Sequence, residues 1–112
     1  SRALAVLRCF ESAPGDLGVT EIATRTGLTV STAHRLARAL CDGGVLVHDP
    51  RTERYRLGPL LVVLGRKAEA ELGYAQAMPV LEELAAATGE SVNLGIRAGR
   101  DVLVVLDVLL PF

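Results

Sequence analysis

Apolar residues recur at spacings of three and four through the first third of the chain, and this period predicts helices. The first predicted helix runs over Arg2–Ala13, with Leu4, Leu7 and Phe10 on its inner face. Proline and glycine interrupt helical periodicity, so the run Pro14-Gly15-Asp16 is expected to end this helix.

Two shorter helical patterns follow closely. The second helix is expected over Glu21–Thr26 with Thr20 as its N-cap, and the third over Val30–Cys41 with Thr29 as its N-cap. Only the tight turn Gly27-Leu28-Thr29 separates the two helices. This spacing is typical of a helix-turn-helix.

Particular residues meet the physical requirements of that motif. Ala23 is small enough for the two helices to cross closely, and Gly27 tolerates the left-handed φ that the turn needs. The small core between the helices is predicted to contain Ile22, Leu28 and Leu36.

After the third helix the apolar period changes to two, in the stretch VLVHDPRTERYRLG. Val45 and Val47 share one face of a first strand, and Tyr55 and Leu57 share one face of a second. The run Asp49-Pro50-Arg51-Thr52 between them has turn chemistry. A two-stranded hairpin behind the third helix would form a wing.

Residues 74–112 are predicted as helix, strand, turn and strand. The helix Ala75–Thr88 carries an apolar face made of Met78, Leu81, Leu84 and Ala85. The strands Ser91–Arg97 and Val102–Leu109 flank the turn Ala98-Gly99-Arg100-Asp101. A helix and a two-stranded hairpin are marginal alone, so we expect this segment to be the incomplete start of an α/β domain. The fold class is therefore predicted as α+β.

The outer face of the third helix is the main candidate site. It carries small hydroxyls, an imidazole and two arginines, where mixed charge would suffice for solvation. In a helix-turn-helix the N-terminal part of this helix enters the major groove, so Ser31, Thr32 and Arg35 are expected at base edges and Arg38 at phosphate. His34 either reads a base or bonds locally. The alternative is an ordinary solvated face.

The wing carries three more candidate DNA contacts, Arg51, Arg54 and Arg56. The alternative is that these charges only protect the hairpin from edge-to-edge pairing. Asp49 and Glu53 interleave with the arginines and would neutralise part of their charge. Thr20 joins the candidates because a helix N-terminus can offer amides to a phosphate, although capping alone would explain it.

The net charge of −1 hides an asymmetry along the chain. Residues 1–58 hold eight basic residues, all arginine, against six acids, whereas residues 59–112 hold four against seven. Arginine's planar fork suits phosphates and guanine edges better than lysine's point charge.

Other function classes find little support. No apolar run reaches the ~18 residues of a membrane span, and no signal peptide is evident, so a cytoplasmic protein is expected. Cys9 and Cys41 are expected to be reduced thiols, because a metal site would require them to converge with His34 and His48 without any paired spacing. Nucleotide loops and activated nucleophiles are absent from the sequence, so neither an enzyme nor a cofactor is expected.

Four motifs together resemble the IclR family of bacterial transcriptional regulators: the opening RALAVLRCF, then EIATRTGL, STAHRL and the closing YRLG. The resemblance implies a winged helix-turn-helix over residues 1–58 and a linker helix within residues 59–73. AMPVLEELAAATGESVNLGIRAGRDVLVVLDV then resembles the opening of the family's effector-binding domain, here residues 74–112. Because that domain continues further in the family, a fragment is expected, with most of any small-molecule pocket outside it.

The expected linker helix, Pro59–Leu72, carries a wide apolar stripe made of Leu60, Leu61, Leu64, Ala68 and Leu72. It either packs on its own winged domain or forms a dimer seam. A dimer is favoured, because DNA half-sites usually require a two-fold partner. The resemblance also implies dimers through the first helix, which adds Leu4 to the expected interface.

The sequence therefore predicts a dimeric, ligand-responsive DNA-binding regulator that recognises a double-stranded operator. Two alternatives remain open. One is a winged-helix module that binds another protein through the third helix. The other is a metal- or redox-responsive repressor built on Cys9 and Cys41.

Overall fold

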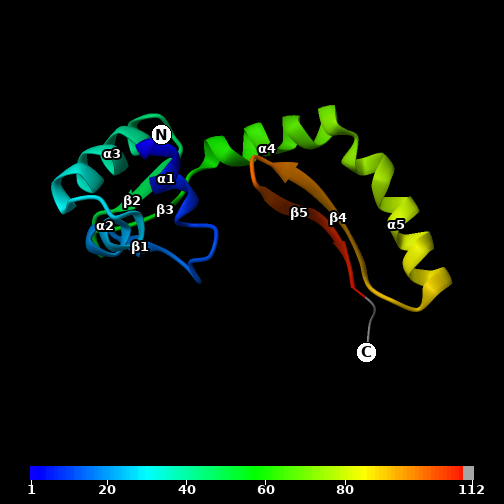
Figure 1. The fold of residues 1–112 in the computed structure, drawn as a ribbon. Helices are drawn as coiled ribbons and strands as arrows, with labels where there is room; N and C mark the ends of the chain where they lie inside the picture. The colour runs from blue at the N-terminus through cyan, green and yellow to red at the C-terminus, as the bar shows by residue number, and fades with distance from the viewer. Residues whose placement is uncertain (110–112) are drawn as a thin grey trace. The chain divides into compact units, whose positions relative to one another are not determined.

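The computed structural model describes residues 1–109, and the side chains of all of these except Ala98, Asp101 and residues 103–105. The chain divides into two compact units, Ser1–Gly65 and Arg66–Phe112. Within the described residues, no helix is both long and apolar enough to cross a membrane. The elements, labelled in Figure 1, are α1 (Arg2–Arg8), β1 (Leu17–Gly18), α2 (Val19–Thr26), α3 (Val30–Asp42), β2 (Leu46–Asp49), β3 (Arg54–Leu57), α4 (Pro59–Leu72), α5 (Tyr74–Thr88), β4 (Val92–Ala98) and β5 (Asp101–Val108).

Helix α1 is shorter than the sequence pattern predicts. It ends at Arg8, and the N–H groups of Phe10 and Glu11 bond three residues back instead of four. Its inner face is centred on Val6, which is fully buried, whereas Leu4 is 57% exposed. The expectation that Leu4 faces inward was wrong, because this short helix presents Val6 to the core.

Helix α2 begins at Val19, two residues before the predicted start. Gly18 is its N-cap, and the Glu21 carboxylate accepts a hydrogen bond of 3.2 Å from the Gly18 N–H. Thr20 therefore lies inside the first turn and is not the cap. At the other end Gly27 adopts the predicted left-handed conformation, with φ of 73°.

Helix α3 has caps at both ends. The predicted cap Thr29 accepts a hydrogen bond of 3.2 Å from the Thr32 N–H. At the C-terminus Gly44 is left-handed, with φ of 79°, and the amides of Gly44 and Val45 bond to Cys41 and Leu40. This pattern is a Schellman motif, which satisfies the last carbonyls of the helix.

The wing belongs to a three-stranded antiparallel sheet of order β1-β3-β2, and not to a two-stranded hairpin as predicted. Leu17 pairs with Tyr55, and Gly18 pairs with Arg54. A two-residue strand contains no alternation, so the pattern gives no signal for β1. The inward face was also assigned one residue out of register, since Leu46 rather than Val45 or Val47 is buried.

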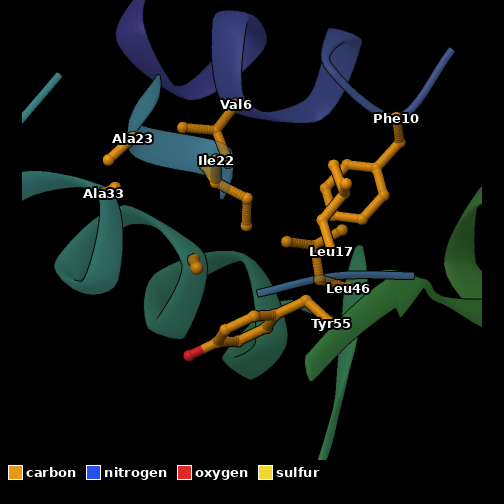
Figure 2. Close-up of a cluster of buried hydrophobic side chains, with 9 residues drawn as sticks. Val6, Phe10, Leu17, Ile22, Ala23, Ala33, Leu46 and Tyr55 are labelled. Atoms are coloured by element: carbon orange, nitrogen blue, oxygen red, sulfur yellow. The ribbon is translucent and has the colours of Figure 1, made fainter. Parts of the chain in front are cut away.

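One apolar core holds the first unit together, and Figure 2 shows side chains from α1, α2, α3 and the sheet converging in it. Its largest fully buried side chains are Val6, Leu17, Ile22 and Leu46. Burial of one such side chain stabilises a fold by about 1.5–3 kcal/mol. Ala33 and Ala37 are completely buried as well, which lets α3 approach the other helices closely.

The start of α4 is tied to the turn that follows α3. The Gly58 N–H donates to the Val45 carbonyl at 2.7 Å, and the Leu60 N–H donates to the Gly44 carbonyl at 3.2 Å. A Cβ atom on Gly58 would collide with the Gly44 carbonyl oxygen and lie 2.9 Å from the Val45 carbonyl carbon. Only glycine therefore fits at this junction.

In the second unit, α5 packs beside the β4–β5 hairpin. The strands pair from Val92↔Val108 to Ala98↔Asp101, with a bulge between Leu94 and Gly95. Tyr74 and Ala85 are the buried residues of α5. The predicted helix, strand, turn and strand are confirmed, although Leu84 is 48% exposed.

Candidate nucleic-acid interface

Helix α3 presents an open polar face opposite its buried alanines. Ser31, His34, Arg35 and Arg38 are all exposed. Among the residues that the structure describes, neither arginine forms an ion pair and neither Ser31 nor His34 forms a side-chain hydrogen bond. These donors are therefore available to a ligand.

Thr32 differs from its neighbours on this face because it takes part in the helix cap. Its backbone N–H and its hydroxyl both bond to the Thr29 hydroxyl, the second contact measuring 3.0 Å. The Thr32 side chain is half-buried. It is a less available contact than Ser31 or Arg35.

The first helix of the motif contributes a shallow hollow of about 270 Å³, lined by Thr20, Glu21, Thr24 and Arg25. Thr20 is exposed, and only its carbonyl is used, by the Thr24 hydroxyl at 3.0 Å. Arg25 is exposed without an ion pair in the described part of the chain. Sequence reasoning missed Arg25, although its place in the last turn of α2 was a usable signal.

The wing tip is a tight loop between β2 and β3. Glu53 is left-handed, with φ of 60°, and its N–H bonds to the Asp49 carbonyl at 2.8 Å. The Asp49 carboxylate accepts from the Arg51 N–H at 2.9 Å, and the Arg51 side chain is 89% exposed. The Glu53 carboxylate turns back to His48 Nε2 at 3.0 Å. Arg51 Nε also lies 3.8 Å from Asp49 Oδ1, a long ion pair that leaves most of the Arg51 side chain exposed.

Arg56 and Arg54 are both on β3, but the groups around their side chains differ. Arg56 is exposed and has no ion-pair partner among residues 1–109. Arg54 donates from Nε to Asp16 Oδ1 at 2.7 Å and from Nη2 to the Asp16 carbonyl at 3.0 Å, and its Nη1 lies 2.7 Å from Glu21 Oε1. The expectation that Arg54 is free to reach a phosphate does not fit this geometry.

The same contacts shift the ionisation of the groups involved. The Gly18 N–H, followed by the Arg54 guanidinium, lowers the pKa of Glu21 below its usual value. Hydrogen bonds to Asp16 and Glu21 raise the pKa of Arg54. Both ions are therefore charged together at neutral pH.

The two cysteines lie in the packing around the core. Cys9 and Cys41 are free and half-buried, and the Cys9 thiol donates to the Val6 carbonyl at 2.9 Å. Burial raises the pKa of both thiols. Among the described residues, no three metal-ligating side chains converge on one position.

Helix α4 has no buried residue. Of the expected interface, Leu4, Leu64 and Leu72 are between 52% and 59% exposed, and Leu60 and Leu61 are half-buried. Sequence analysis left out Val62 and Val63, which are equally open.

A separate hollow of about 390 Å³ lies in the second unit. Its wall includes Tyr74, Met78 and Leu106, with Arg66 and Glu69 at the α4 side. The Tyr74 hydroxyl is buried and has no hydrogen-bond partner among the described residues.

A close pair of helices, an open arginine-bearing face on the second of them and a sheet that carries the exposed Arg56 together define a winged helix-turn-helix protein. Residues 1–50 match the model of the IclR helix-turn-helix domain. This match identifies residues 1–50 as the helix-turn-helix domain of the IclR family of transcriptional regulators, as the motifs of this part of the chain predict.

Similarity to known proteins extends beyond the matched domain. The chain is 36% identical over 111 residues to the glycerol operon regulatory protein of Streptomyces coelicolor, covering 98% of this chain and 44% of that protein. It resembles an IclR transcriptional regulator from Silicibacter sp. TM1040 with a TM-score of 0.86 at 26% identity, covering 96% of this chain and 43% of that one. An IclR homologue from Microbacterium hydrocarbonoxydans, solved with 4-hydroxybenzoate, gives a TM-score of 0.76 at 26% identity over 96% and 45% of the chains.

The chain thus spans less than half the length of these relatives. The relatives are named as transcriptional regulators and not as enzymes. The α+β fold with an N-terminal winged helix-turn-helix is the fold they share.

Proposed function

We propose that this chain is the operator-binding part of a dimeric transcriptional regulator, joined to the beginning of a domain that responds to a small molecule. The observation that carries the proposal is the open face of α3, where Arg35 and Arg38 are exposed and form no ion pair among the described residues. Arginines that acids of their own chain do not engage can donate to base edges and phosphates.

The proposed contacts follow from the position of each residue. Ser31 and Arg35 lie in the first two turns of α3 and face base edges, and Arg38 lies one turn further on, at phosphate. The further proposed contacts are Thr32 and His34 on α3, Thr20 and Arg25 on α2, and Arg51 and Arg56 on the wing. Arg54 is left out, because two carboxylates already occupy its guanidinium.

The remaining parts of the proposal concern the whole protein. The domain order is a winged domain over residues 1–58, a linker over residues 59–73 and an effector-linked segment from residue 74. A second copy of the chain would bind the apolar face of α4, and the protein would act in the cytoplasm, where operator DNA lies. The relative solved with 4-hydroxybenzoate supports a small organic effector, and no catalytic role is proposed.

The first experiment is fluorescence anisotropy of the chain with a pool of random-sequence duplexes, titrated across salt. A phosphate-reading face should give a straight line of log affinity against log salt, with a slope of about −0.9 per phosphate neutralised. Sequencing the enriched duplexes should then reveal two symmetric half-sites.

On a selected duplex, Arg35→Ala should weaken binding by roughly 1–3 kcal/mol and relax the preference at one base pair. Arg97→Ala is the matched control, since Arg97 is an exposed arginine of the other unit and binding should not change. Dimeric protein that ignores DNA at low salt would overturn the proposal and favour a protein-binding module.

A further inference from the structure

The Arg54 cluster, defined as Arg54, Asp16 and Glu21, joins three separate pieces of the first unit. Arg54 is on β3, Asp16 lies just before β1, and Glu21 is in the first turn of α2. The three ion-pair and hydrogen-bond contacts to the guanidinium measure 2.7, 2.7 and 3.0 Å. The guanidinium therefore bonds both to the sheet edge and to the helix-turn-helix.

Each acid in the cluster also bonds to the chain in a way that fixes its own position. Glu21 Oε1 accepts from the Gly18 N–H at 3.2 Å while it contacts Arg54 Nη1. Asp16 offers both its carboxylate and its backbone carbonyl to the same guanidinium. Gly18 in turn pairs with Arg54 in the sheet register, so the contacts close a ring around β1.

The local charge argues against a second use of Arg54 as a phosphate ligand. Two carboxylates and one guanidinium leave the cluster with a net charge of −1. A phosphate approaching Arg54 would meet this negative charge and would compete with bonds that are already short. Arg56, two residues along the same strand, forms no ion pair with any side chain that the structure describes.

We propose that Arg54, Asp16 and Glu21 are positioning residues that fix β3 against α2 and so determine where the wing arginines Arg51 and Arg56 meet DNA. This inference depends on the proposed DNA binding. It also gives Arg54 a positioning role within the protein, whereas its place on the wing suggested a contact with DNA. The position of the wing on DNA then depends on the bonds from Arg54 to Asp16 and Glu21, which lie within the protein.

The test compares Glu21→Gln, Asp16→Asn and Arg54→Ala on one selected duplex across salt. If the cluster positions the wing, all three substitutions should weaken binding about two- to fivefold, the scale of an exposed ion pair, because each of them displaces the wing arginines from DNA. If Arg54 instead contacts phosphate, Arg54→Ala should flatten the slope by about 0.9, and removing either acid should tighten binding. That second pattern would overturn the inference. Arg56→Ala is the matched control and should flatten the slope.

A background without wing arginines separates positioning from general stability. In the double variant Arg51→Ala/Arg56→Ala, adding Glu21→Gln should cause no further loss of affinity, because the wing no longer has charges to place. An equal loss in this background would show a merely structural role and overturn the inference.

A readout without DNA distinguishes failure of this inference from failure of the proposed function. Hydrogen exchange should quicken at the amides of β1 and β3 in Glu21→Gln, while amides in the middle of α3 stay protected. Unchanged exchange at β1 and β3 would overturn the inference even where DNA binding is confirmed. Wild-type protein that binds no duplex would instead overturn the proposed function.

Discussion

Arginines of similar sequence context have different environments in this protein, and neighbouring acids decide which are free. Arg35 and Arg38 form no ion pair among the described residues, although Asp42 lies one turn beyond Arg38 on α3, so their charge is available. Arg54 lies where β1 and α2 bring two acids within 2.7 Å, so its charge is already balanced. At the scale of single residues, whether an arginine is available to DNA depends on acids distant in the sequence as much as on the position of the arginine itself.

Gly58 supplies a test at the same scale, because a side chain at this position has no room. Gly58→Ala should destabilise the first unit and displace the start of α4, since the new Cβ would collide with the Gly44 carbonyl oxygen. Urea denaturation should show a loss of about 1–3 kcal/mol, the range for overpacking a tight site.

The control for this substitution is Gly65→Ala, inside the helix α4 that follows Gly58. Nothing lies within 4 Å of a Cβ at Gly65, which is exposed, so alanine should stabilise the helix by about 0.5–1 kcal/mol. A neutral Gly58→Ala would show that the linker does not press against the turn after α3.

At the scale of elements, α3 combines a fixed frame with an open face. Thr29 and the Schellman motif at Gly44 satisfy its two ends, and Ala33 and Ala37 seat it against the core. The same Gly44 carbonyl accepts the Leu60 N–H, so the end of α3 and the start of α4 share one turn. A displacement of the linker would therefore reach the proposed DNA-reading helix directly.

Removal of the N-cap tests how far α3 depends on this frame. Thr29→Ala should destabilise the first unit by about 0.5–2 kcal/mol, because the Thr32 N–H loses its acceptor. Thr29→Ser keeps the hydroxyl and should retain most of the stability in the same urea titration. Equal losses in the two variants would show that the methyl group matters and the cap does not.

At the scale of the whole molecule, α4 carries more of the exposed large apolar side chains than any other element that the structure describes. A helix without a buried residue and with Leu64 52% exposed gains little from its own chain. The apolar face proposed for a second copy would remove this surface from water.

Leu64→Glu should therefore convert the proposed dimer to a monomer in sedimentation velocity at micromolar protein concentration. The matched comparison is Val63→Glu, because Val63 is 64% exposed and lies about 100° around α4 from Leu64 at 3.6 residues per turn. Loss of the dimer in the Val63 variant alone would place the interface on the Val63 side of the helix.

The sequence predicted the elements with a strong local signal. The Thr29 cap and the glycine turns gave the helix-turn-helix, and the resemblance to the IclR family gave the linker helix α4 from Pro59. The length of α1, the start of α2 and the inward residues of β2 were wrong, since each depends on packing or on partners distant in the sequence.

The open face of α3 follows from sequence alone, because helical period and residue type place Ser31, His34, Arg35 and Arg38 together. The role of Arg54 does not follow from sequence. Strand β1 has only two residues and no pattern of its own, yet its pairing with β3 brings Asp16 and Glu21 to the guanidinium. Local periodicity determined which side chains face outward, and long-range strand pairing decided which of those charges remain free.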